Sequence, residues 1–299
     1  MFSSSVYTTA LRKFKLNTPV VFTFHINWKV YETLGLEPFQ HVKNQLKIRG
    51  INNFEFLPIL TDKNSDMTNR LKQFKRGLEK IVDKNDQKVH IIGYSFAGII
   101  PKTYISQLNG EDYIQSLLTI STPHTSCRYV DLLNGRAFDD KWYLREPAIR
   151  SAGVYLDWLR AEYNSKALSL LPAELSPEVK YHSVGGRRMP IKCSESLRVS
   201  CEDILDDPEQ DFSNDGLIWV EEAKFGKHLV NFDADHFELI GMRPKFNASM
   251  MFDLYAQTVK SCDSDFIRKN SKIEKKSENK LDISGVEIRD ISQNVNLKY

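Results

Sequence analysis

The stretch GYSFAG, residues 93–98, directly follows the apolar run Val89–Ile92. A short apolar run that ends in small residues predicts a buried strand followed by a tight turn. Gly93 and Ala97 lie two positions before and two positions after Ser95, which matches the G-x-S-x-G pattern with alanine in the last place. A serine on such a turn can project toward a base and act as a nucleophile. Small residues selected only for close packing are the alternative interpretation.

The segments on either side of this turn alternate between strand-like and helix-like patterns. Such alternation predicts an α/β fold with a mostly parallel central sheet and helices on both faces. The predicted strands are residues 19–25, 54–60, 88–94, 114–122, 179–186 and 227–232, and the predicted helices are residues 38–50, 65–84, 96–108 and 245–262.

The helix predicted at residues 65–84 has the clearest periodicity in the chain. Its apolar residues step by four and three positions, so they form one stripe along a helix. Ser65 is the predicted N-cap, because a serine side chain accepts a hydrogen bond from an N–H of the first turn. The stripe consists of Met67, Leu71, Phe74, Leu78 and Ile81.

Composition limits the classes of function. The 299 residues are 41% apolar and 27% charged, as in a globular protein with a substantial core. A formal net charge of +2 provides no basic field, so nucleic-acid binding is excluded. No apolar run approaches 18 residues, so we expect a soluble or peripheral protein. The four cysteines lack CxxC spacing and indicate a reducing compartment, while pairing of Cys193 with Cys201 stays open for a secreted chain.

Three regions are predicted along the chain. Residues 1–18 form a basic N-terminal arm, residues 19–262 form the α/β domain, and residues 263–299 form a polar, lysine-rich tail with loose order. The first 31 residues contain four basic residues, several serines and no acid, which is typical of a mitochondrial transit peptide. An uncleaved basic arm on a cytoplasmic protein is the alternative.

Two later residues complete a set of nucleophile, acid and base in the chain order Ser, Asp, His. Asp215 lies in the turn-forming sequence SNDG, where backbone groups can fix a carboxylate. His236 follows 21 residues later, just past the predicted strand at residues 227–232. A base at this place must turn one ring nitrogen toward Ser95 and the other toward Asp215. Taken singly, Asp215 also fits an ordinary turn residue, and His236 fits a surface or capping histidine.

Four ordered stretches resemble the α/β-hydrolase lipases related to bacterial triacylglycerol lipases and to their mitochondrial eukaryotic relatives. GYSFAG is similar to the family's Gly-His-Ser-Gln-Gly-Gly turn, and TISTPHTS at residues 119–126 is similar to its Thr-Ile-Gly-Thr-Pro-His-Arg-Gly stretch. NDGL and DH then fall where the family carries its acid and its base. The resemblance extends from about residue 19 to residue 261 and implies an α/β-hydrolase fold.

Carried over residue by residue, the resemblance makes Ser95 the nucleophile, Asp215 the orienting acid and His236 the general base. It also makes the backbone N–H of Phe96 one donor of an oxyanion hole. The second donor of that hole would be the backbone N–H of Asn27, in the stretch HINW.

This second donor is where the chain departs from the family pattern. Ile26 stands where the family has glycine, and a β-branched residue does not readily take the positive φ values open to glycine. We therefore expect a misshapen oxyanion hole, and loss of one donor lowers the rate by about 10²- to 10³-fold. His25 is either a packed histidine at a strand end or a direct participant.

Residues 128–171 interrupt the alternation and are expected to form helices inserted over the sheet as a lid. Trp142, Tyr155 and Trp158 are the predicted wall for an acyl chain. Plain core packing of these helices is the alternative. His124, in the stretch STPH, is expected to fix a loop rather than to take part in chemistry.

An acidic stretch near His236 admits two interpretations. Glu238 lies where the bacterial relatives place a calcium-binding carboxylate, and Asp206, Asp207 and Asp211 could add oxygen ligands. We favour a solvated acidic loop, so no metal is predicted.

Together these features predict a serine hydrolase that cleaves carboxylic esters, with lipid acyl esters as substrates and without a cofactor. One alternative is a subunit with the hydrolase fold and weak or no activity, in a larger and mitochondrial assembly. Ile26 and Ala97 favour this alternative. An acyltransferase that uses the same three residues is another. The expected partner is a lipid or ester substrate, with peripheral membrane contact and a protein complex left open.

Overall fold

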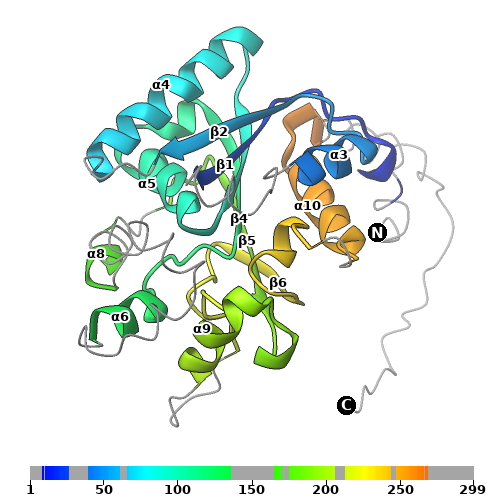
Figure 1. Ribbon diagram of the computed structural model, residues 1–299. Coiled ribbons are helices and arrows are strands. Elements are labelled where there is room, and N and C mark those ends of the chain that lie inside the picture. Colours follow the sequence, from blue (N-terminus) through cyan, green and yellow to red (C-terminus); the bar gives the residue numbers. More distant parts are fainter. Residues whose placement is uncertain are drawn as a thin grey trace, which may run out of the picture. The chain divides into compact units, whose positions relative to one another are not determined.

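The computed structural model describes residues 9, 11–26, 40–60, 66–135, 165–169, 171, 175–205, 213–243, 247–265 and 267–268. The chain divides into two units, residues 1–263 and residues 264–299, and the sheet belongs to the first. In the described part of the chain, six strands form one sheet in the order β2-β1-β3-β4-β5-β6 (Figure 1), and every neighbouring pair is parallel. The strands are β1 (Val20–Ile26), β2 (Phe54–Leu60), β3 (Val89–Tyr94), β4 (Ile114–Ile120), β5 (Lys180–Arg187) and β6 (Lys227–Asp233).

Helices connect the strands and cover both faces of the sheet, so the predicted α/β architecture with a parallel central sheet is confirmed. The six observed strands fall within two residues of the predicted ones at either end. The α-helices are α3 (Gln40–Ile48), α4 (Met67–Asn85), α5 (Ile99–Gln107), α6 (Arg128–Gly135), α8 (Ser165–Ser169), α9 (Glu195–Leu205) and α10 (Ser249–Cys262). The short 3₁₀ turns are η1 (Ser95–Gly98), η2 (Gly110–Asp112), η4 (Pro190–Lys192) and η5 (Glu238–Ile240).

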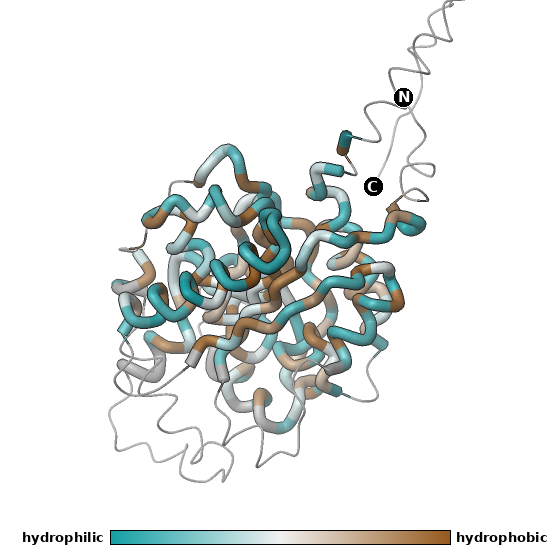
Figure 2. The backbone as a smooth tube through the Cα atoms, turned by 90° about the horizontal axis from the view of Figure 1, so that it is seen from above, coloured by the Kyte–Doolittle hydropathy of each residue, from teal (hydrophilic) through white to brown (hydrophobic). Residues whose placement is uncertain are grey.

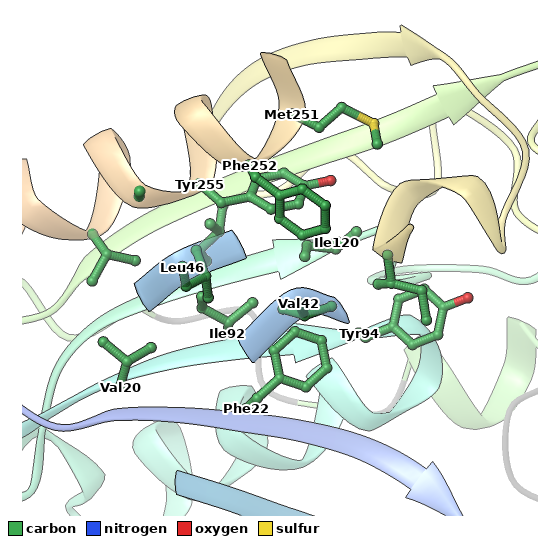
Figure 3. Packing of buried hydrophobic residues seen from close by; sticks show 14 of the residues in the cluster. Val20, Phe22, Val42, Leu46, Ile92, Tyr94, Ile120, Met251, Phe252 and Tyr255 are labelled. Atoms are coloured by element: carbon green, nitrogen blue, oxygen red, sulfur yellow. The ribbon is translucent and has the colours of Figure 1, made fainter. Parts of the chain in front are cut away.

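Alternate side chains of each strand build two apolar layers, one on either face of the sheet. Phe22 and Ile92 belong to the layer that α3 and α10 cover, where they lie near Val42 and Phe252 (Figure 3). Val21, one residue along from Phe22, belongs to the opposite layer under α4 and α5. The two layers sandwich β3, which is buried along its whole length.

The hydropathy of the chain follows this layering. Hydrophobic stretches concentrate along the strands in the middle of the fold, whereas the outer helices are largely hydrophilic (Figure 2). Continuous apolar strands such as VHII in β3 are the pattern expected when both faces of a parallel sheet are covered. No helix among the described residues has the length and apolar composition that a membrane span requires.

Helix α4 follows its predicted apolar stripe but begins differently from the prediction. Leu71, Phe74 and Leu78 are buried against the sheet. The N-cap is Asp66, whose carboxylate accepts a hydrogen bond of 2.7 Å from the N–H of Asn69. The prediction of Ser65 as N-cap is therefore wrong, and Ser65 itself lies outside the described residues. An aspartate caps as well as a serine, so residue type alone does not favour Ser65 over the residue that follows it.

Residues 11–16 pack against the sheet unit. Leu11 and Leu16 are buried, and Leu16 forms a parallel bridge with Ile51 just before β2. The ammonium of Lys260, on α10, donates a hydrogen bond of 3.2 Å to the carbonyl of Leu11. This segment is therefore tied to both the start of β2 and the last helix.

Two parts of the fold differ from the sequence pattern or lie beyond it. Helix α9 is absent from the helices predicted from the sequence. Its sequence SESLRVSCED is mostly polar, and Leu197 and Cys201 are buried on one side of it. Of the predicted insertion at residues 128–171, the structure describes α6, α8 and Leu171. The predicted acyl-chain wall of Trp142, Tyr155 and Trp158 lies outside the described residues.

Truncation of Phe74 should test the apolar layer between α4 and the sheet. Phe74 is fully buried and packs edge-on against Tyr104 of α5, so Phe74→Ala should lower the free energy of unfolding by about 3–5 kcal/mol. Urea unfolding followed by circular dichroism measures this loss. Lys72→Ala, on the exposed side of the same helix, is the control and should change stability by less than about 0.5 kcal/mol. Equal effects of the two substitutions would contradict the layer.

Candidate active site

The strand order reverses between β1 and β3. The chain steps from β1 to β2 in one direction and then returns past β1 to reach β3, so the connections after β1 and β3 leave toward opposite sides. In parallel α/β sheets, ligands bind at the carboxyl ends of the strands where the order reverses in this way. Ser95 directly follows β3 at this place.

The turn after β3 is tight because two glycines touch. A Cβ atom on Gly93 would lie 2.6 Å from the Cα of Gly98, and a Cβ atom on Gly98 would lie 2.2 Å from Oγ1 of Thr122, so neither position has room for a side chain. Ser95, between them, has φ 55°, in the left-handed region that few residues other than glycine adopt. Ala97 is fully buried in the layer under α5, so its methyl group is accommodated. The sequence pattern singled out Gly93 and Ala97, whereas Gly98 makes the close contact.

Hydrogen bonds connect Ser95, His236 and Asp215 in one chain. His236 Nδ1 lies 2.7 Å from Asp215 Oδ2, and His236 Nε2 lies 2.9 Å from Ser95 Oγ. Because a carboxylate only accepts hydrogen bonds, Nδ1 carries the proton and Nε2 is free to accept the serine proton. The structure therefore brings the three predicted side chains together from three separate loops. All three are buried, with Ser95 the most exposed at 7%.

The carboxylate of Asp215 is fully buried and accepts four hydrogen bonds. Oδ1 accepts the backbone N–H groups of Leu217 and Ile218, at 3.0 and 2.8 Å. Oδ2 accepts from His236 Nδ1 and from the hydroxyl of Ser121. Such donors stabilise the ionised carboxylate where water does not reach it. The two backbone donors directly follow the turn predicted at SNDG, and Ser121 was not foreseen.

The imidazole of His236 is fixed by Tyr94 as well as by the acid. The ring centroids of Tyr94 and His236 lie 4.8 Å apart, with the planes tilted by 33°. The Tyr94 hydroxyl donates to the His236 carbonyl at 2.9 Å, and the His236 N–H donates to the Asp215 carbonyl at 2.8 Å. The imidazole therefore keeps its orientation without help from a substrate. Tyr94 is inside the motif GYSFAG, but the pattern gives that position no role.

Helix α9 and the turn before it brace the loops that carry the acid and the base. The Ser194 N–H and hydroxyl donate to Asp235 Oδ2 at 2.8 and 2.7 Å, next to His236. Leu197 packs against Gly216, next to Asp215. All four cysteines are free and buried, so Cys193 and Cys201 are not paired in this structure.

Glu238 is buried, so the prediction of a solvated acidic loop is wrong at this residue. Its carboxylate accepts the Asp235 N–H at 2.9 Å and lies 2.8 Å from a guanidinium nitrogen of Arg243 and 3.3 Å from those of Arg188. The charges of Arg188 and Arg243 thus compensate the buried carboxylates of Glu238 and Asp235. Asp206, Asp207 and Asp211 lie outside the described residues, and within the described ranges no three His, Cys, Asp or Glu side chains are grouped as metal ligands.

The oxyanion donor predicted at Phe96 follows Ser95 in η1, and Asn27, the second predicted donor, lies outside the described residues. His25 lies at the carboxyl end of β1, beside the backbone of Phe96. Burial and the nearby charge of Arg70 lower the pKa of His25 to about 3, although hydrogen bonds to the backbone oppose this. His25 is therefore a neutral, packed side chain at neutral pH. Ile26 ends β1 opposite Leu60.

His124 fixes the loop after β4, as its sequence context predicted. Its Nε2 lies 3.0 Å from the hydroxyl of Thr119, and its ring stacks on Phe225 with 4.2 Å between centroids. Lys102 donates to the His124 carbonyl at 3.1 Å. Burial and the charge of Lys102 keep the pKa of His124 well below its usual value, so the ring is neutral.

Glu222 connects the loop after β4 to the region before β6. It accepts hydrogen bonds from the N–H of Arg128, at the start of α6, and from the N–H of Trp219 and the hydroxyl of Ser126. Burial raises the pKa of Glu222 to about 7, although these three donors oppose the shift. The start of α6 is thus attached to a carboxyl group that changes its protonation near neutral pH.

Solved structures of lipases and esterases resemble this fold over most of the chain. The metagenomic carboxyl esterase MGS0156 has a TM-score of 0.58 at 13% identity, with 83% of this chain and 76% of that chain covered. The Staphylococcus hyicus lipase has a TM-score of 0.54 at 14% identity, with 87% and 98% covered. The mature Bacillus licheniformis lipase BlEst2 has a TM-score of 0.53 at 17% identity, with 76% and 89% covered.

These likenesses show the fold, which is the α/β-hydrolase fold that these lipases and this esterase share. No family model matches the sequence. No curated protein matches it.

The pH dependence of stability should show that the carboxyl group of Glu222 holds a proton in the folded state. Because its pKa in the folded state lies above that of an exposed glutamate, the folded state holds an extra proton between about pH 4.5 and 7. The stability contributed by this proton is complete below that window and is lost as the pH rises through 7, at no more than about 1.4 kcal/mol per pH unit. Glu222→Gln should therefore flatten the fall in unfolding free energy between pH 5.5 and pH 8.

Urea unfolding at these two pH values measures the difference. Glu221→Gln, a neighbouring exposed substitution, is the matched control and should leave the wild-type difference in place. If Glu222→Gln shows the same fall as wild type, the proton is not held at Glu222.

Proposed function

We propose that this protein is a serine hydrolase that cleaves carboxylic esters through a covalent acyl-enzyme. The observation that carries the proposal is the continuous hydrogen-bond chain from Ser95 Oγ through the imidazole of His236 to Asp215 Oδ2. It lies at the carboxyl ends of parallel strands, where α/β folds bind ligands. A serine, a base that can take its proton and a carboxylate that orients the base are the parts that nucleophilic acyl transfer requires.

In the proposed acylation step, Ser95 Oγ attacks the ester carbonyl carbon while its proton moves to His236 Nε2. The carbonyl oxygen becomes an oxyanion, to which the N–H of Phe96 donates. When the intermediate collapses, the bond to the alcohol breaks and His236 returns the proton to the leaving alkoxide. An acyl-Ser95 ester and a free alcohol result.

In the deacylation step, a water molecule takes the place of the alcohol. His236 removes a proton from the water as it attacks the acyl carbon, and then protonates Ser95 Oγ as the carboxylic acid leaves. Asp215 stays ionised throughout and stabilises the imidazolium that forms twice in the cycle. Its four donors keep the buried carboxylate in place during both steps.

Lipid acyl esters are the proposed substrates. The structures that share the fold include two lipases and a carboxyl esterase. Trp142, Tyr155 and Trp158, in the predicted insertion, are proposed to line the acyl chain. With an alcohol in place of water, the same residues would catalyse acyl transfer, so a product analysis in the presence of an alcohol distinguishes the two reactions.

Replacement of the nucleophile tests the reaction directly. Ser95→Ala should reduce the hydrolysis of p-nitrophenyl esters by at least about 10³-fold, because the attacking oxygen is lost while the fold is kept. A series of esters with graded chain length measures both the rate and the acyl preference. Ser106→Ala is the matched control on α5, where the hydroxyl bonds only to carbonyls of its own helix, and it should retain wild-type rates. Unchanged turnover in Ser95→Ala would end the proposal.

A fluorophosphonate probe separates an active enzyme from an inactive hydrolase-shaped subunit. Only a serine with a usable base and oxyanion site reacts rapidly with such a probe. We expect labelling of wild type and of Ser106→Ala and no labelling of Ser95→Ala. A folded wild-type protein that neither reacts with the probe nor cleaves any ester would favour the inactive subunit, with the oxyanion loop at Ile26 as the first place to look.

A further inference from the structure

The hydroxyl of Ser121 and the imidazole of His236 donate hydrogen bonds to the same oxygen atom of Asp215. Ser121 is the first residue after β4, and its hydroxyl donates to Asp215 Oδ2, the oxygen that also accepts from His236 Nδ1. Ser121 is 1% exposed, so bulk water does not reach this hydroxyl in the folded protein. Residues 121 and 215 are 94 positions apart in the chain, and the sheet brings them together.

The backbone of Ser121 has an unusual conformation for its residue type. Its φ is 47°, in the region where glycine is favoured and a Cβ atom is strained. Among the described residues, four other than glycine have positive φ. Two of them, Asp86 and Asn109, are of types that tolerate this region, and the other two are Ser95 and Ser121. The strained serines are therefore both in the candidate site, where strain is retained when a side chain is required.

Hydrogen bonds on both sides hold Ser121 in this conformation. Its N–H donates to the carbonyl of Val184 in β5 at 2.9 Å. The next residue, Thr122, donates through its hydroxyl to the carbonyl of Ser95 at 2.7 Å. The end of β4 is thus anchored to β5 on one side and to the nucleophile turn on the other, and the Ser121 hydroxyl has a fixed direction.

We propose that Ser121 is a positioning residue that orients the carboxylate of Asp215 and limits the basicity of His236. This inference rests on the proposed function of the site, because it assigns Ser121 a part in the same proton relay. Without the hydroxyl, Oδ2 would keep His236 as its donor, and the carboxylate could turn about the two N–H bonds to Oδ1. The imidazole would then lose part of its fixed orientation toward Ser95.

The direction of the effect on His236 follows from charge. A donor to Asp215 stabilises the bare negative charge more than it stabilises a carboxylate already neutralised by an imidazolium. The hydroxyl of Ser121 therefore favours the neutral imidazole, and its removal should raise the pKa of His236. A base with a raised pKa loses activity at the acid end of the pH profile, because a larger fraction of it is already protonated.

Other polar and ionisable groups lie near Asp215 and His236. All of them are present in wild type and in the variants below. They are Tyr94 at the end of β3, Ser95 in η1, the thiols of Cys127, Cys193 and Cys201, and the acids Asp235 and Glu238 with Arg188 and Arg243.

Two substitutions at Ser121 separate its hydroxyl from its backbone. Ser121→Gly removes both the hydroxyl and the strain, whereas Ser121→Ala removes the hydroxyl and keeps the strain. The melting temperature of Ser121→Gly should exceed that of Ser121→Ala by about 2–4 °C. Yet both variants should lose about tenfold in kcat/KM with little change in KM, because one buried hydrogen bond in the relay is lost. If Ser121 were only a turn residue with no part in the relay, Ser121→Gly should instead keep the wild-type kcat/KM and be more stable than wild type.

Ser116→Ala is the matched control. Ser116 is also buried in β4, and its hydroxyl bonds to His90 Nδ1 at 2.7 Å, away from Asp215. This variant loses a buried hydrogen bond of the same kind, so its stability should fall while the pH profile stays as in wild type.

The decisive measurement is the titration of His236 by NMR of the ¹⁵N-labelled imidazoles in the ligand-free protein, with the signal assigned through His236→Asn. Ser121→Gly should raise the pKa of His236 by about half a pH unit, and the acid limb of kcat/KM should move by the same amount. Ser116→Ala should show neither change. Ser121→Gly serves for this test even if Ser121→Ala does not fold.

The outcomes distinguish this inference from the proposed function. If wild type cleaves no ester but the His236 titration moves in Ser121→Gly, the positioning role stands and the proposed function fails. If wild type cleaves esters and Ser121→Gly matches it in both titration and kcat/KM, the positioning role is overturned and the proposed function stands.

Discussion

The contact between Gly93 and Gly98 is the constraint on which the candidate site depends. It allows β3 to end and α5 to begin across a 3₁₀ turn of four residues, and Ser95 must take a positive φ to follow that path. The Ser95 side chain then projects at the carboxyl-terminal edge of the sheet, where the other parallel strands also end. A bulkier turn would move the hydroxyl away from His236, because the imidazole is fixed from its other side by Tyr94.

The other loops reach the same edge because every described strand pair is parallel. Three buried acids near this edge are compensated in different ways: Asp215 by hydroxyl, imidazole and backbone donors, Glu238 by two arginines, and Glu222 by backbone N–H groups together with its raised pKa. The site is therefore assembled mainly from contacts that exist before any substrate arrives. Pre-assembly of this kind is how proteins stabilise developing charge without reorganisation.

Local patterns predicted much of this arrangement, and long-range contacts account for what they missed. The strands and α4 were recognisable because their side chains must satisfy the sheet and the helix periods within a few residues. Ser95, Asp215 and His236 stood out through turn chemistry and chain order. Ser121 did not, since its partner lies 94 positions away and a serine at a strand end is unremarkable in sequence. Glu238 looked solvated because its arginine partners lie elsewhere in the chain.

The attachment of residues 11–16 to α10 restricts proteolytic trimming of the chain. Lys260 is 2% exposed, and its ammonium donates to the carbonyls of Leu11 and Arg12. A protease that cut beyond Leu16 would leave this cation buried without those acceptors and would uncover Ile51, just before β2. Cleavage within residues 11–16 is therefore expected to destabilise the folded core, whereas cleavage before Leu11 would leave these contacts in place.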